Sequence, residues 1–181
     1  MTRSVAFFRN LNLGQRRSHS PTRPELLDAL LRAGATDAVN FQVNGTIIID
    51  ADADGDGDGD AQALANEAVR LLTPVCGYDD LVVVRPAAWV LDLDLDAITQ
   101  PAEVSFFDGP DPFPEPLPWR SSEGGLTVIR ADALHALSLD DVEQTSGATW
   151  TLERLLGMRV TSRGVPTMLR LQGRLRAIAE D

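Results

Sequence analysis

Two β-rich runs joined by Asn44-Gly45 constrain the fold of this chain more than any other feature of its sequence. Residues 39–43 and 46–50 are rich in β-branched and aromatic side chains. An Asn-Gly pair between such runs is the strongest short-range signal of a β-hairpin, because both central residues of a type I′ turn need a positive φ. The sequence therefore predicts a hairpin closed by a two-residue type I′ turn.

The segments before and after the hairpin are predicted to form further strands and helices. Residues 4–9 form an apolar run of strand length, and residues 81–85 form another. Thr22 and Glu25 have the spacing of a capping box, so they predict a helix over 24–33 that Gly34 ends. Apolar residues recur at helical spacing over 64–72. The order β-α-β-β-α-β predicts a ferredoxin-like subdomain over residues 1–85.

The second half of the chain predicts a smaller α+β subdomain over residues 86–181. A helix is expected over 87–98, and strands are expected over 103–107 and 126–130. A proline-rich loop spans 108–118 between those strands. Helical spacing returns over 150–156 and in a final helix over 167–178. The predicted fold class is therefore α+β, with Pro86 at the boundary between two subdomains.

The composition indicates where in the cell the protein is located and which covalent or metal cross-links it cannot form. No apolar run approaches the ~20 residues that span a bilayer, and residues 1–5 lead into a strand without a signal pattern, so we expect a cytoplasmic protein. The single Cys76 excludes an internal disulfide and a thiol-based zinc site. All 16 basic residues are arginine, which is typical of a bacterium with a high-GC genome.

Three segments of the chain resemble a bacterial family catalogued as domain of unknown function 1697. They are residues 7–14, 41–45 and 161–167, in the same order as the family's motifs. The chain reads as a diverged member, since Asn10-Leu11-Asn12 replaces the family's Gly-Ile-Asn. Gly164-Val165-Pro166 likewise replaces Asn-Trp-Asn. The resemblance implies two small related α+β subdomains and implies no established activity.

No cofactor or metal site is predicted. The aspartate-rich run over 50–60 imitates the start of a calcium loop, but no reading frame combines the required Gly at position six with Glu at position twelve. We therefore interpret it as a solvated loop. His19 and His135 are the only imidazoles, and neither lies in a hydrolase or metalloprotease motif.

Arginine is concentrated at the two ends of the chain. Residues 1–32 hold six Arg against two acidic residues, and residues 154–181 repeat that balance, whereas the chain as a whole carries a net charge of −11. Guanidinium groups in loops at strand ends and near helix starts are natural ligands for phosphate or carboxylate. We therefore predict a binding protein for a small anionic ligand, with a site formed by Arg9, Asn12, Arg16, Arg17, Arg163 and Thr167. The family resemblance also covers Arg9, Asn12, Arg163 and Thr167. Pairing of these arginines with the many acidic residues is the alternative interpretation.

Other functions remain open at this stage. Phe7, Phe8 and Phe41 lie on predicted strands, where exposed rings would stack the bases of single-stranded nucleic acid, although the negative net charge disfavours such a partner. An enzyme that uses His19 or His135 as acid or base is a further alternative. A homodimer that buries the first sheet would leave the same sequence pattern.

Overall fold

The computed structural model describes residues 2–52, 58–109, 112–140 and 147–180, and its chain divides into two compact units. Unit 1 is Met1–Asp92 and unit 2 is Leu93–Asp181. The sequence placed the boundary at Pro86. In the structure α3 (Ala87–Leu91) packs against the first and last strands of unit 1 and therefore belongs to that unit.

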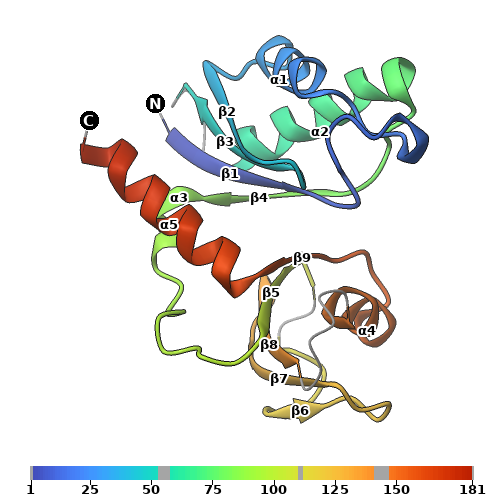
Figure 1. The fold of residues 1–181 in the computed structure, drawn as a ribbon, viewed down its shortest axis with the longest axis vertical. Helices are drawn as coiled ribbons and strands as arrows, with labels where there is room; N and C mark the ends of the chain where they lie inside the picture. Colours follow the sequence, from blue (N-terminus) through green and yellow to red (C-terminus); the bar gives the residue numbers. More distant parts are fainter. Residues whose placement is uncertain (1, 53–57, 110–111, 141–146, 181) are drawn as a thin grey trace. The chain divides into compact units, whose positions relative to one another are not determined.

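Unit 1 is a four-stranded antiparallel sheet with helices on one face (Figure 1). The strand order is β2-β3-β1-β4. The elements of this unit, besides α3, are β1 (Thr2–Phe8), the short 3-10 helix η1 (Arg16–Ser18), α1 (Arg23–Arg32), β2 (Asp37–Gln42), β3 (Thr46–Ala51), α2 (Asp58–Cys76) and β4 (Val82–Pro86). Unit 1 is therefore an α+β unit built on one antiparallel sheet.

Alternation along the strands determines the core of unit 1. Side chains two residues apart on a strand face the same side, so Ala6 and Phe8 of β1 join Ile47 and Ile49 of β3. These side chains pack against α1 and α2, for example against Leu30, which is fully buried. Helix spacing and strand alternation thus give one common core.

The predicted capping box of α1 is confirmed. Thr22 Oγ1 accepts a hydrogen bond from the Glu25 amide, and Glu25 Oε2 accepts one of 2.8 Å from the Thr22 amide. Both bonds satisfy N–H groups that the first turn of a helix leaves without intrahelical partners. The local sequence therefore specifies where α1 begins.

The hairpin is present, but its predicted turn type is wrong. Gln42 pairs with Thr46, so the connection contains Val43, Asn44 and Gly45. Among these residues only Gly45 has a positive φ, of 74°, whereas a type I′ turn needs two such residues. A three-residue loop that ends in a left-handed Gly is the next most common solution.

Unit 2 is a five-stranded antiparallel sheet with the order β6-β7-β8-β5-β9 (Figure 1). Its elements are β5 (Ala102–Phe106), β6 (Trp119–Arg120), β7 (Leu126–Ala131), β8 (His135–Asp140), α4 (Gly147–Leu156), β9 (Thr161–Gly164) and α5 (Val165–Glu180). The sequence predicted β5, β7, α4 and α5 and missed the other strands.

One prediction in the second half is corrected by the structure, and the proline-rich loop is present where the structure describes it. The helix expected over 87–98 ends at Leu91, because residues 92–98 leave the helical path after α3. The proline-rich segment does precede β6, and its residues 110–111 lie outside the described part of the chain. Phe113 anchors this segment by packing into the core of unit 2.

Helix α4 covers one face of the second sheet. Ala148 and Leu152 of α4 are fully buried and pack with Val128 of β7 and Ala136 of β8. Across the described residues, no helix has both the length and the apolar character needed to cross a membrane.

Candidate functional site: a tryptophan-lined groove in unit 2

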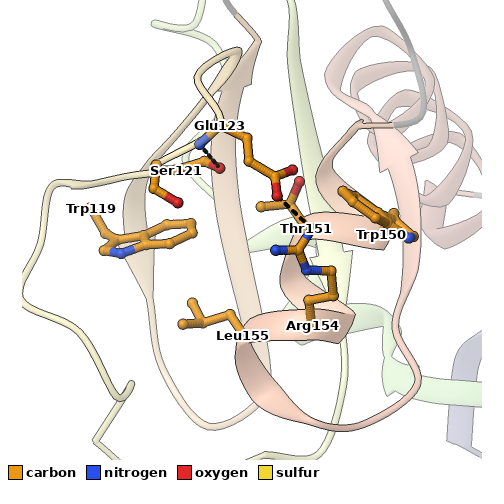
Figure 2. A pocket seen from close by; sticks show the side chains of 8 residues that line it. Trp119, Ser121, Glu123, Trp150, Thr151, Arg154 and Leu155 are labelled. Atoms are coloured by element: carbon orange, nitrogen blue, oxygen red, sulfur yellow. Dashed lines mark hydrogen bonds and ion pairs between the residues drawn. The ribbon is translucent and has the colours of Figure 1, made fainter.

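A groove of about 190 Å³ lies between β6, the turn after it and α4 (Figure 2). It combines indole rings, hydroxyl groups and one ion pair in a small volume. The groove is lined by Trp119, Ser121, Ser122, Glu123, Trp150, Thr151, Arg154 and Leu155. Pockets for drug-sized ligands measure about 300–1,000 Å³, so this groove suits a ligand about the size of one ring.

The strand side of the groove is held by backbone pairing. Trp119 pairs with Val128 in the β6–β7 ladder, and its half-buried indole packs against the core of unit 2. The following turn is closed by the Gly124 amide, which donates to the Ser121 carbonyl at 3.0 Å. Gly124 adopts a φ of 74°, a conformation that favours glycine. Backbone hydrogen bonds therefore hold the strand and turn that carry Trp119, and packing against the core restricts its indole.

The helix side of the groove follows from spacing on α4. Residues four apart on a helix lie on the same face, so Trp150 and Arg154 are neighbours, as are Thr151 and Leu155. The Arg154 guanidinium carbon lies 4.5 Å from the centroid of the Trp150 ring. This cation–π contact orients a long side chain that would otherwise sample many rotamers.

One ion pair crosses the groove. Arg154 Nη1 donates to Glu123 Oε1 at 2.6 Å, and both side chains are about half exposed. Exposed ion pairs contribute little to stability, about 0–1 kcal/mol, because water competes for both groups. A ligand anion can therefore replace the Glu123 carboxylate on Arg154 at small cost.

A buried carboxyl group lies beneath α4. Glu103 is 5% exposed, and the Ala148 amide in the first turn of α4 donates a hydrogen bond to it. Burial raises the pKa of Glu103 to about 7, with a further contribution from the charge of Asp140; Arg163 and the Ala148 amide act in the opposite direction. Glu103 Oε2 and the Ser138 hydroxyl opposite it have no hydrogen-bond partner among the described residues.

The site residues predicted in unit 1 lie in and beside the loop after β1. Arg9 Nη1 is 2.7 Å from Asp80 Oδ2, and Arg16 Nη2 is 2.6 Å from Glu25 Oε1. Arg17 is exposed on η1, and exposed Asn12 uses its backbone amide to donate to the Ser20 hydroxyl. The structure thus brings these residues into one loop region, where Arg9 and Arg16 already have carboxylate partners.

The remaining predicted residues lie in unit 2. Arg163 of β9 is buried, and its Nη1 donates to Thr161 Oγ1 at 3.0 Å and to the Ser162 carbonyl at 2.8 Å. Thr167 lies in the first turn of α5, where its hydroxyl accepts a bond of 3.3 Å from Arg170. Neither residue lines the tryptophan-lined groove.

The imidazoles have local partners. His19 Nδ1 is 3.3 Å from the Cys76 carbonyl. His135 Nδ1 is 2.9 Å from Asp132 Oδ1, which also accepts hydrogen bonds from the backbone amides of Leu134 and His135. Burial raises the pKa of Asp132, but these amides and the imidazole outweigh it and leave the pKa below its usual value. His135 thus closes a turn and does not line the groove.

Two other features of the sequence, the phenylalanines of β1 and the aspartate-rich run, provide no ligand-binding site among the described residues. Phe7 and Phe8 are fully buried, so their rings are not available for base stacking. Residues 53–57 of the aspartate-rich run lie outside the described residues. A second cavity, of about 400 Å³, adjoins this run at Asp52, and apart from the carboxylates of Asp52 and Glu67 it is lined by alanines, Gly34 and Leu64.

Sequence reasoning missed the groove because its walls come from a two-residue strand and a helix far along the chain. A usable signal existed in Trp150 and Arg154, which stand four residues apart on a predicted helix. A large aromatic residue that remains 54% exposed is an unusual surface feature. The position of Trp119 opposite α4 was not visible in the sequence, since β6 was not predicted.

Comparisons with known proteins bear on the fold. No protein-family model matches the chain, and no curated protein sequence matches it. Among solved structures, the chain is similar to conserved bacterial protein SP0830 from Streptococcus pneumoniae, with a TM-score of 0.63 and 15% sequence identity over 97% of this chain and 99% of that one. At this identity the similarity shows a shared α+β fold.

Proposed function

We propose that this protein binds a small anionic ligand in the tryptophan-lined groove of unit 2, with Arg154 as the group that receives the anion. The observation that carries the proposal is the stacking of the Arg154 guanidinium on Trp150, 4.5 Å from the ring centroid. A planar guanidinium held in this way offers paired N–H donors to a carboxylate or phosphate with little further loss of rotamer entropy.

The arrangement around Arg154 supports an exchangeable anion. Glu123 is its carboxylate partner in the groove, and the Glu123 side chain is 53% exposed. An incoming carboxylate would release Glu123 into water, where the cost of breaking the pair is small. The hydroxyl groups of Ser121, Ser122 and Thr151 line the same space and add neutral hydrogen-bonding groups.

The loop predicted from the sequence is the alternative location for an anion. It is less favourable, because the Arg9–Asp80 pair, whose side chains are only 19% and 18% exposed, is harder for a ligand to displace than the half-exposed Arg154–Glu123 pair. Nucleic acid is a weaker candidate ligand, since the chain has a net charge of −11 and Phe7 and Phe8 are buried.

Titration calorimetry of the whole chain with inorganic phosphate, acetate and benzoate tests this function. We expect at least one of these anions to bind, and we expect Arg154→Gln to weaken it by about tenfold or more, since hydrogen bonds to charged groups contribute about 1.5–3 kcal/mol. Arg17→Gln is the matched control, because Arg17 is an exposed arginine of the alternative site. The proposal fails if no anion binds, or if Arg17→Gln abolishes binding while Arg154→Gln does not.

The structural and cellular parts of the proposal have separate support. We propose that unit 1 is ferredoxin-like, on the grounds of its β2-β3-β1-β4 order and antiparallel pairings. The ordered motifs over 7–14, 41–45 and 161–167 support membership of the family named above. The single cysteine, which permits no internal disulfide, supports a cytoplasmic location.

A further inference from the structure

One wall of the groove is formed by the Trp119 indole, and the opposite wall carries the Arg154 guanidinium. In Figure 2 the Trp119 indole lies on one side of the opening and the Arg154 guanidinium on the other, with Leu155 at the base between them. A ligand that reaches Arg154 from solvent therefore passes along the face of an indole. Acetate or inorganic phosphate would leave that face unused.

Trp119 is suited to stacking because its position is already determined. Its backbone is paired to β7, and its half-buried ring packs against the core that contains Phe113 and Val128. A ring with so little freedom loses little entropy when a ligand stacks on it. The aromatic wall is thus a rigid part of the groove.

The charges in the groove favour an anionic ring over a cationic one. The Arg154 guanidinium already occupies the Trp150 face on which a cation would stack, and a cation that paired with Glu123 would lie beside this guanidinium. A carboxylate meets the opposite situation, since it replaces Glu123 on the same guanidinium. The volume also limits the ligand to about one ring.

From these observations we infer that the ligand of the groove is a single-ring aromatic acid, whose ring stacks on Trp119 while its carboxylate binds Arg154. This inference rests on the proposed function and specifies its ligand class. It assigns separate roles to the two walls, because Trp119 selects the ring and Arg154 selects the charge.

The indole N–H signals of the ¹⁵N-labelled chain provide a test with an internal control. The chain has three tryptophans, and Trp89 belongs to unit 1. Benzoate is expected to shift the signals of Trp119 and Trp150 and to leave that of Trp89 unchanged.

Benzoate should bind about tenfold more tightly than acetate, as expected for one aromatic stacking contact. Benzyl alcohol and benzylamine, which keep the ring and lose the carboxylate, should bind at least tenfold more weakly than benzoate.

Variants at Trp119 separate stacking from folding. Trp119→Leu should remove the advantage of benzoate over acetate, and Trp119→Phe should retain much of it, because a smaller aromatic face remains. Equal affinities of acetate and benzoate for the parent chain would overturn the ring assignment while leaving the anion site intact. If benzyl alcohol binds as well as benzoate, the charge assignment is overturned. If neither acid shifts any indole signal, the ring and carboxylate assignments are both overturned; if inorganic phosphate also fails to bind, the proposed function fails as well.

Discussion

Replacing Glu103 by glutamine should make the protein more stable at alkaline pH. Glu103 is 5% exposed and its pKa is raised from 4.5 to about 7, so its ionised form is disfavoured in the folded chain. A difference of 2.5 pKa units, at about 1.36 kcal/mol per unit, corresponds to about 3 kcal/mol above pH 7. Glutamine has the shape of the protonated acid and keeps an acceptor for the Ala148 amide.

The sign of the pH dependence follows from proton binding. Between pH 4.5 and about 7 the folded state holds a proton on Glu103 that the unfolded state has lost. The free energy of unfolding therefore falls as pH rises through this window and levels off above it. The charged groups that act on this carboxyl are Asp140, which raises its pKa, and Arg163, which lowers it.

Urea unfolding of the parent chain and of Glu103→Gln at pH 5, 6, 7 and 8 measures this effect. The difference in free energy of unfolding should be below about 1 kcal/mol at pH 5 and should grow to about 3 kcal/mol at pH 8. Glu123→Gln is the control, because Glu123 is exposed and its variant should show a nearly constant difference. A difference between Glu103→Gln and the parent that does not change with pH would refute the reasoning.

Three further substitutions test the capping box of α1, the hairpin turn between β2 and β3, and the packing of α4. Thr22→Ala removes the capping box with Glu25 and should lower the free energy of unfolding by about 1 kcal/mol, measured by urea unfolding. Gly45→Ala should cost more than 1 kcal/mol, because its φ is 74° and an added Cβ would lie 2.8 Å from the Cβ of Phe8; a neutral effect would contradict the assigned turn. Leu152→Ala should cost about 2–5 kcal/mol, since Leu152 is fully buried on the face of α4 that packs against the sheet, and an unchanged thermal midpoint would contradict that packing.

The parts of the fold that sequence predicted are those specified by neighbouring residues. The capping box of α1 needs only Thr22 and Glu25, and the hairpin needs only the runs beside Asn44 and Gly45. The turn type was mispredicted because the Gln42–Thr46 pairing across the two strands, and not the Asn-Gly pair alone, determines which residues enter the loop. Strand β9 was missed since its four residues contain two polar and one charged side chain that become buried or half-buried only in the sheet.

The candidate site was harder to predict from the sequence, because its residues come together only in the folded chain. Arg9 and Arg16 were predicted to receive a ligand, and the structure shows each next to a carboxylate. Arg154 is also ion-paired, but a nearby indole orients it toward a groove. Tertiary contacts determine whether an arginine faces a cavity or only an acidic neighbour. Counting charged residues along the sequence gives no information about these contacts.

The affinity of benzoate for Glu123→Gln tests the central claim most directly. Glu123 competes with a ligand anion for Arg154, so its neutral variant should bind benzoate more tightly than the parent, by up to about fivefold for a pair of about 1 kcal/mol. Titration calorimetry at one pH and one salt concentration suffices for this comparison. Weaker binding of benzoate to Glu123→Gln would contradict the claim, because Glu123 would then be assisting the ligand and not competing with it.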